Sequence, residues 1–378
     1  MKFLHTADWH LGKLVHGVYM TDDQAYILDQ FIEIADQEKP DAIIIAGDLY
    51  DRSVPPADAV NLLNKTLYTL NVEMKIPVIA ISGNHDSADR IAFGSEWYKH
   101  SDLHVTGKWG PDKLPVEIKG VRFHSVPYAE PGVIRELLKN DSIISHHDAM
   151  KETIKVICKD SEFGKCPEVL IGHSFVSGGM SSDSERALSV GGAGTVGKEL
   201  FAPFTYTALG HLHSPHAIND KKIHYAGSLL KYSFSEAGHK KMVKCVSIEN
   251  GEATVKEIHL KPERDLVILK GSLEEMLQGD FYHNKNDFIK AVLTDEGSLI
   301  DPINKLRSVY PNVLHLERER AVRDSKREKQ IRKKHDHLSD TELFKRFFEY
   351  VTEADWTDEM EAELIRTMDL SIKGSDQT

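Results

Sequence analysis

The feature of this sequence that most limits its fold is a repeated unit, in which a short apolar run ends in a polar tip. Continuous runs rich in Val, Ile, Leu and Ala are typical of strands that are buried on both faces. Two segments with apolar residues at helical spacing, Thr21–Gln37 and Ala57–Leu70, lie between runs. We therefore predict an α/β layered core whose polar residues follow the C-terminal ends of the strands, where open α/β sheets bind ligands. The runs are Phe3–Leu4, Ala42–Ala46, Val78–Ile81, Val169–Ile171 and Tyr206–Leu209.

A change in composition near Lys261-Pro262-Glu263 predicts a domain boundary. We expect an α/β domain at residues 1–260, a small α+β domain at 261–317, a basic linker at 318–337 and a helical docking segment at 338–378. In the small domain we expect strands at 266–269, 288–293 and 313–316, and helices at 273–277 and after Asp301-Pro302, with Asp as N-cap and Pro at the first helical position.

The C-terminal segment carries a capping-box signature, Ser339 with Glu342, followed by a first amphipathic helix. A second helix is expected to start near Thr357 or Asp358. Two short helices beyond a charged linker bury little surface by themselves, so this segment is interpreted as an element that docks on a partner.

The charge of the chain is unevenly distributed. Its net charge of −12 opposes DNA binding, which normally needs a basic surface. The stretch Arg318–Lys334, however, has nine Lys or Arg against three Asp or Glu, and bound metal ions would add positive charge. The three cysteines lack metal-site spacing and favour a reducing compartment. With no apolar leader or membrane span in view, we expect a cytoplasmic protein.

The polar tips contain side chains that bind metal ions. Aspartate, asparagine and histidine ligands without thiolate favour Mn²⁺, Fe²⁺ or Zn²⁺. Two such ions ~3.5–4 Å apart can hold a phosphodiester and activate water. A lone Gly-His or Gly-Asp pair usually marks a turn, but five polar tips after five predicted strands favour a two-metal site. The clusters are Asp8-x-His10, Gly47-Asp48, Gly83-Asn84-His85-Asp86, Gly172-His173 and Gly210-His211-x-His213.

In this order the clusters resemble the DxH, GD, GNH(D/E), GH and GHxH pattern of calcineurin-type metallophosphoesterases. The chain is also similar to the SbcD family of bacterial nuclease subunits at Leu4–Lys13, Ser182–Arg186, Ala226–Ser228 and Tyr232–Glu236. The resemblance implies a sandwich of two β-sheets flanked by helices, with a small α+β capping domain and a C-terminal helical segment that binds an ATPase.

Roles for individual residues are implied by the same resemblance. One metal ion would be held by Asp8, His10, Asp48 and His213, and the other by Asp48 as a bridge with Asn84, His173 and His211. The family usually prefers Mn²⁺. His85 would donate a proton to the leaving 3′-oxygen, and Asp86 is expected to orient that imidazole.

The resemblance further implies a homodimer of this chain within a heterotetramer that contains an SbcC-type ATPase. The substrates would be double-stranded DNA ends, single strands and hairpins, and no membrane would be involved. The expected processes are DNA repair, recombination and replication.

Two alternative functions are compared with that of a DNA nuclease. A small-molecule phosphodiesterase or nucleotidase could use the same two-metal site, although the segments after residue 260 would be superfluous for a small substrate. A non-catalytic DNA-scaffolding subunit should have lost ligands, whereas all seven are present together with His85. His146-His147-Asp148 also follows an apolar run and is interpreted as a decoy.

Overall fold

The computed structural model describes residues 1–185, 194–278, 280–296 and 299–319, together with 344–345, 348–349, 356–357, 359–364 and 366. By its internal contacts the chain forms two compact units, Met1–Glu317 and Arg318–Thr378. None of the helices in the described part of the chain is long and apolar enough to cross a membrane.

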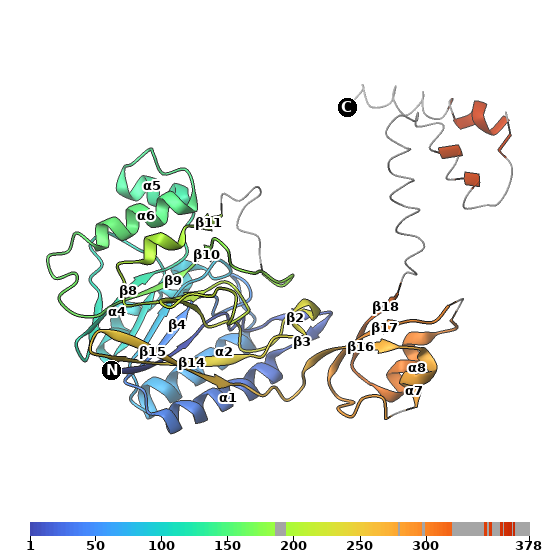
Figure 1. Ribbon diagram of the computed structural model, residues 1–378, viewed down its shortest axis with the longest axis horizontal. Coiled ribbons are helices and arrows are strands. Elements are labelled where there is room, and N and C mark those ends of the chain that lie inside the picture. Colours follow the sequence, from blue (N-terminus) through green and yellow to red (C-terminus); the bar gives the residue numbers. More distant parts are fainter. Residues whose placement is uncertain are drawn as a thin grey trace. The chain divides into compact units, whose positions relative to one another are not determined.

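Two β-sheets form the centre of the first unit (Figure 1). The first sheet has six strands in the order β15-β14-β1-β4-β5-β6, and the second has five in the order β13-β12-β9-β8-β7. The first comprises β15 (Glu252–His259), β14 (Met242–Glu249), β1 (Lys2–Thr6), β4 (Ala42–Ala46), β5 (Val78–Ile81) and β6 (Leu103–Thr106). The second comprises β13 (Ile223–Tyr225), β12 (Tyr206–Gly210), β9 (Glu168–His173), β8 (Val121–Val126) and β7 (Val116–Ile118).

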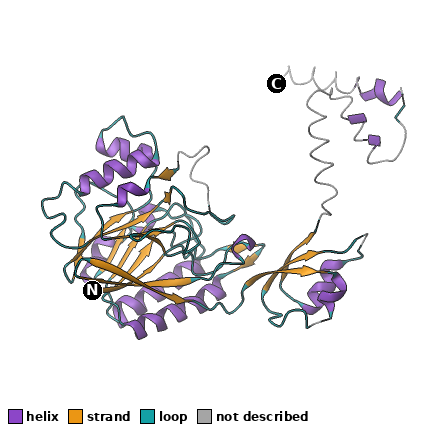
Figure 2. Cartoon of the chain, in the orientation of Figure 1, coloured by secondary structure: helices purple, strands orange, loops and turns teal. Residues whose placement is uncertain are grey.

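Helices cover the outer faces of this sandwich (Figure 2). On the first sheet lie α1 (Thr21–Glu38) and α2 (Ala57–Leu67), which continues as a π-helical stretch, η1 (Tyr68–Glu73). On the second lie α5 (Pro131–Leu138) and α6 (His146–Ile157). Shorter elements are β2 (Leu14–Val15), β3 (Val18–Tyr19), α3 (Ala88–Ile91), α4 (Ser95–Tyr98), η2 (Lys99–Ser101), β10 (Phe175–Val176), β11 (Thr195–Val196), η3 (Lys198–Phe201) and η4 (Phe234–Glu236).

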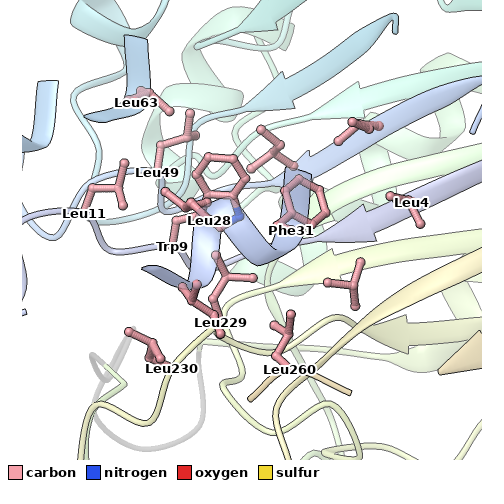
Figure 3. Close-up of a cluster of buried hydrophobic side chains, with 14 of the residues drawn as sticks. Leu4, Trp9, Leu11, Leu28, Phe31, Leu49, Leu63, Leu229, Leu230 and Leu260 are labelled. Carbon is pink, nitrogen blue, oxygen red and sulfur yellow. The ribbon is translucent and has the colours of Figure 1, made fainter. Parts of the chain in front are cut away.

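The predicted fold, two β-sheets flanked by helices, is confirmed. The strands β4, β5, β9 and β12 are buried along their whole length, as continuous apolar runs predict. One apolar layer fills the space between the sheets, and a second joins α1 and α2 to the first sheet. Figure 3 shows part of this second layer, where Trp9 and Phe31 pack together beside several leucines.

The residues after 260 form a smaller sheet with its own apolar core. Parallel strands β16 (Leu266–Gly271) and β17 (Phe288–Leu293) pair, and β18 (Val313–Arg318) completes a three-stranded sheet covered by α7 (Leu273–Leu277) and α8 (Pro302–Val309). The expected α+β order is therefore present. Asp301 occupies the predicted N-cap position and Pro302 begins α8, but Asp301 has a left-handed φ of 48° and its carboxylate accepts from the Asn304 side chain instead of from the main chain of the helix.

Of the predicted C-terminal helices, only part lies within the described residues. The Thr357 hydroxyl accepts a hydrogen bond from Met360 N at 3.4 Å, at the start of a helical stretch over 359–364, as expected for a helix that begins near Thr357. The predicted capping box at Ser339 and most of the basic linker lie outside the described residues.

One aromatic side chain of the layer between the two large sheets contacts two aromatic rings of the opposite sheet. Phe3 on β1 is fully buried and packs edge-on against Phe123 and Tyr206 of the opposite sheet, each with a centroid separation of 5.6 Å. We expect Phe3→Ala to lower the free energy of unfolding by about 3–5 kcal/mol, because the cavity lies between two rigid sheets. Urea denaturation would measure this. Leu114→Ala, at an 86% exposed position, is the control and should change stability by less than about 0.5 kcal/mol. Equal losses in both variants would contradict this role of Phe3.

Candidate metal centre

All seven predicted ligands lie at one end of the sandwich. Those from the first sheet follow β1, β4 and β5, and those from the second sheet end β9 or follow β12. Because both sheets present the C-terminal ends of these strands to the same place, residues up to 205 positions apart meet there. The seven are Asp8, His10, Asp48, Asn84, His173, His211 and His213.

The carboxylate of Asp48 lies between the two groups of ligands. Its Oδ2 atom is 3.3 Å from His173 Nε2 and 3.6 Å from His10 Nε2. Its Oδ1 atom accepts a hydrogen bond from the main-chain N–H of His85 at 2.8 Å. One oxygen is thus held by the main chain, while the other faces imidazoles from both groups.

The first group contains Asp8, His10 and His213, all buried, with ligand atoms within 4.8 Å of one another. The Nε2 atoms of His10 and His213 are only 3.1 Å apart. Both Asp8 oxygens accept from the main-chain N–H of His211, at 2.9 and 3.1 Å. These contacts direct two imidazole nitrogens and a carboxylate to one point.

The second group is arranged around Asn84. Its Oδ1 atom is 2.9 Å from His173 Nε2 and 3.0 Å from His211 Nδ1, while its Nδ2 atom is buried without a hydrogen-bond partner among the described residues. The other ring nitrogen of His173 donates to the carbonyl of Ala46 at 2.9 Å. This bond keeps one proton on Nδ1, so Nε2 is the ring nitrogen that would bind a metal ion after losing its own proton.

Burial and mutual proximity perturb the charges of the cluster. Burial raises the pKa of Asp8, and the neighbouring carboxylate of Asp48 raises it further. Burial alone would lower the pKa of His173, but the charges of Asp48 and Asp8 raise it to about 9. Burial lowers the pKa of His213 to about 3. A donor set of carboxylate, amide and imidazole atoms, buried and directed inward, fits divalent cations.

The main chain is contorted to bring these side chains inward. Asp8, His10, Asp48 and His211 all have positive φ angles, of 53°, 46°, 49° and 101°. Such angles are costly for residues other than glycine and persist only where the surroundings enforce them. Here Asp8 N donates to Gly47 O at 3.0 Å and His10 N to Asp48 O at 2.9 Å, so the two loops hold each other.

Two glycines leave room for the ligands beside them. A Cβ at Gly47, where φ is +93°, would lie 2.3 Å from His173 Nδ1. A Cβ at Gly83 would lie 2.2 Å from the Oδ1 atom of Asp48. The glycines that precede the ligands in sequence are therefore required by close approach as well as by turn geometry.

Comparison with known proteins agrees with this geometry. The family model described as calcineurin-like phosphoesterase matches residues 1–215, which include every residue of both groups. The chain belongs to the calcineurin-like phosphoesterase family, among the SbcD nuclease subunits. A second model, described as type 5 capsule protein repressor C-terminal domain, matches residues 262–352.

One relative of this family member is the D subunit of the nuclease SbcCD from Staphylococcus epidermidis, 40% identical over 318 residues, which are 84% of this chain and 85% of the relative. Among solved structures, a dimetal phosphatase from Danio rerio matches with a TM-score of 0.44 and 11% identity, covering 68% of this chain and 96% of that one. A protein from Thermus thermophilus gives a TM-score of 0.38 and 13% identity over 68% and 98%.

One expectation about this phosphoesterase site was wrong. Asp86 does not orient the His85 ring: its carboxylate accepts hydrogen bonds from the main-chain N–H groups of Leu49, Tyr50 and Gly83. The Nδ1 atom of His85 instead donates to the carbonyl of Asp51 at 2.8 Å. The Asp86 carboxylate therefore accepts its hydrogen bonds from the main chain, and these bonds connect the loop that carries Asp48 to the loop that carries Asn84.

His146 and His147, the predicted decoy, make structural contacts. The His147 ring accepts a hydrogen bond from Gly197 N at 3.1 Å, and His146 lies 3.8 Å from the Glu130 carboxylate. Asp148 forms a capping box with Ser145 at the start of α6. None of these three belongs to the ligand groups found among the described residues.

Sequence reasoning missed residues that support the ligands. Asp51 forms a further compact group with His10 and His85, and the Lys13 ammonium lies 2.7 Å from its carboxylate. Ser184 and Glu236 contact His213. Both lie in segments that resemble SbcD, Ser182–Arg186 and Tyr232–Glu236, and that resemblance was the one available signal.

The charge state of the centre predicts how metal uptake depends on pH. Asp8 and His173 have raised pKa values, so near neutrality they hold protons that a ligand must lose. We expect Mn²⁺ affinity to rise as pH increases toward the His173 pKa of about 9, with release of protons. Calorimetric titration in two buffers of different ionisation enthalpy counts those protons. Identical heats in both buffers, and an affinity independent of pH, would contradict the prediction.

Proposed function

We propose that this chain is the nuclease subunit of an SbcCD-type complex and hydrolyses DNA phosphodiesters. Its activities would be ATP-dependent double-strand exonuclease, single-strand endonuclease and hairpin cleavage, in DNA repair, recombination and replication in the cytoplasm, at the nucleoid. The observation that carries the proposal is the Asp48 carboxylate, which faces both ligand groups in a chain that is 40% identical to the D subunit of a nuclease SbcCD.

In this proposal each group holds one ion, so that a bound phosphate would meet two positive centres. Asp8, His10, Asp48 and His213 would hold the first, and Asp48, Asn84, His173 and His211 the second, with Mn²⁺ as the metal. The compact group of Asp8, His10 and His213 and the contacts of Asn84 with His173 and His211 support this division. The two groups adjoin, since Asp8 also lies close to Asp48 and His173. When bound, such a pair supplies Lewis acidity at the phosphodiester and activates water near neutral pH.

His85 would protonate the leaving 3′-oxygen. Its Nδ1–H is held by the Asp51 carbonyl, which leaves Nε2 as the atom that carries the transferred proton. Burial lowers the pKa of His85, while the carboxylates of Asp48 and Asp51 oppose that effect. The negative charge of a bound phosphodiester would further favour the imidazolium, so the acid would form where the substrate is bound.

The remaining segments would serve the complex. We assign nuclease chemistry to residues 1–260, a capping domain to 261–317, a basic linker to 318–337 and binding of an SbcC-type ATPase to 338–378. A homodimer within a heterotetramer is supported by an exposed apolar patch on the first unit: Tyr68, Phe93 and Trp97 line one surface hollow and are 54%, 70% and 71% exposed.

A substrate comparison with His85→Gln tests the proposed function. The intact chain with Mn²⁺ should degrade linear duplex DNA far faster than nucleotides or cyclic nucleotides. His85→Gln should bind as much Mn²⁺ as the parent yet cleave ~10²–10⁴-fold more slowly, because the acid is lost while the ligands remain. His100→Gln, at an exposed position, is the matched control and should cleave normally. A preference for nucleotides would favour the small-molecule phosphodiesterase, and metal loss in His85→Gln would contradict the role of His85.

Deletion of residues 338–378 tests the assignment of the partner. The truncated chain should still cleave small model diesters with Mn²⁺, because every ligand lies in the first unit, but should no longer co-purify with an SbcC-type ATPase. Light scattering should still give a dimer, since the patch of Tyr68, Phe93 and Trp97 is retained. Unchanged ATPase binding would remove the docking assignment.

A further inference from the structure

A buried ion pair with no part in the chemistry described so far lies beside His213. Glu236 is fully buried and Lys241 is 5% exposed, and their side chains are 2.5 Å apart. Lys241 Nζ also donates to the carbonyl of His213 at 2.9 Å and to Ser228 Oγ at 2.8 Å. Burying two charges is costly, so a pair this well bonded needs a structural or functional reason.

The other oxygen of Glu236 is connected to the His213 ring through one hydroxyl. Ser184 Oγ is 2.5 Å from Glu236 Oε1 and 2.7 Å from His213 Nδ1. The direct distance from Glu236 Oε1 to His213 Nδ1 is longer, at 3.5 Å. The short path from carboxylate to imidazole therefore runs through Ser184.

The chemistry of these groups fixes the direction of both hydrogen bonds. A carboxylate paired with an ammonium can only accept, so the Ser184 hydroxyl donates to Glu236. The hydroxyl oxygen then accepts, which requires the proton of His213 on Nδ1. Nε2 is left with a free lone pair, and it is this atom that lies 3.1 Å from His10 Nε2 in the first ligand group.

His213 differs from His173 in how it is held. The main-chain carbonyl of Ala46 fixes the ring of His173, whereas side chains fix both the ring and the main chain of His213. Its N–H donates to Glu185 Oε1 at 2.6 Å, and its C=O accepts from Lys241. The residues that hold His213 in this way belong to two other segments of the chain, Ser184–Glu185 and Glu236–Lys241. They can therefore be substituted without changing His213 itself.

We propose that Glu236, acting through Ser184, is a positioning residue that holds His213 as the Nδ1–H tautomer and so strengthens binding of the metal ion in the first ligand group. This inference rests on the proposed two-metal function. Lys241 balances the Glu236 charge and anchors the His213 carbonyl. Hydrogen-bonded partners of metal-binding histidines typically account for ~10–100-fold in metal affinity.

Calorimetric titration of the full chain with Mn²⁺ tests the inference without relying on activity. The parent should bind two ions. Ser184→Ala should weaken one of the two sites ~10–100-fold and leave the other unchanged. Ser184→Thr, which keeps the hydroxyl, should restore the affinity, and Glu236→Gln should weaken the same site. Ser125→Ala removes another buried hydroxyl, one without a hydrogen-bond partner among the described residues, and should bind like the parent.

The outcomes separate the two proposals. The positioning role would be overturned if the parent binds two Mn²⁺ ions tightly and both Ser184→Ala and Glu236→Gln bind them with the same affinities. That result would leave the nuclease proposal intact. Absence of Mn²⁺ binding by the parent would overturn the nuclease proposal itself. Equal weakening in Ser125→Ala would show a general loss of packing and would also overturn the positioning role. Thermal unfolding of Ser184→Ala should match the parent, because that side chain is partly exposed.

Discussion

The carboxylate of Asp48, buried where two β-sheets meet, is the constraint on which the rest of the first unit depends. An ionised carboxylate costs several kcal/mol to bury unless its oxygens are satisfied. Here one oxygen takes the N–H of His85 and the other faces His10 and His173. Burial alone would raise the pKa of Asp48, but the neighbouring imidazoles hold it well below its ordinary value. Because Asp48 follows β4 of the first sheet and contacts His173 at the end of β9 in the second, the candidate site also connects the two sheets.

Packing and hydrogen bonds around the site offset the free-energy cost of its left-handed residues. Trp9, between the ligands Asp8 and His10, is fully buried; its ring packs on Phe31 and its indole N–H donates to the Thr6 hydroxyl at 2.9 Å. This anchor supports a loop with two left-handed residues, which would otherwise relax. Asp86 accepts hydrogen bonds from the main-chain N–H groups of Leu49 and Gly83. The strained backbone of the candidate ligands is therefore held by the packing of Trp9 and by the hydrogen bonds of Asp86.

The chain belongs to a nuclease family although its net charge is −12. The candidate site itself contains the carboxylates of Asp8 and Asp48, whose charge bound cations would neutralise, and burial raises the pKa of Asp8 so that metal uptake would displace a proton from it. The supporting pair Glu236 and Lys241 adds no net charge, because each cancels the other within hydrogen-bonding distance. Affinity for a polyanion would then depend on bound metal rather than on the charge of the chain alone.

The sequence by itself determined the main strands of the core, their polar tips and the seven candidate ligands, because burial on both faces and turn chemistry depend on consecutive residues such as Ala42–Ala46 and Gly47-Asp48. Only the tertiary structure decided which atoms meet. Asp86 adjoins His85 in the chain, yet the carbonyl of Asp51 holds that ring. Ser184 and Glu236, 52 positions apart, converge on His213. Such contacts depend on how loops from different strands pack, and no local pattern records that.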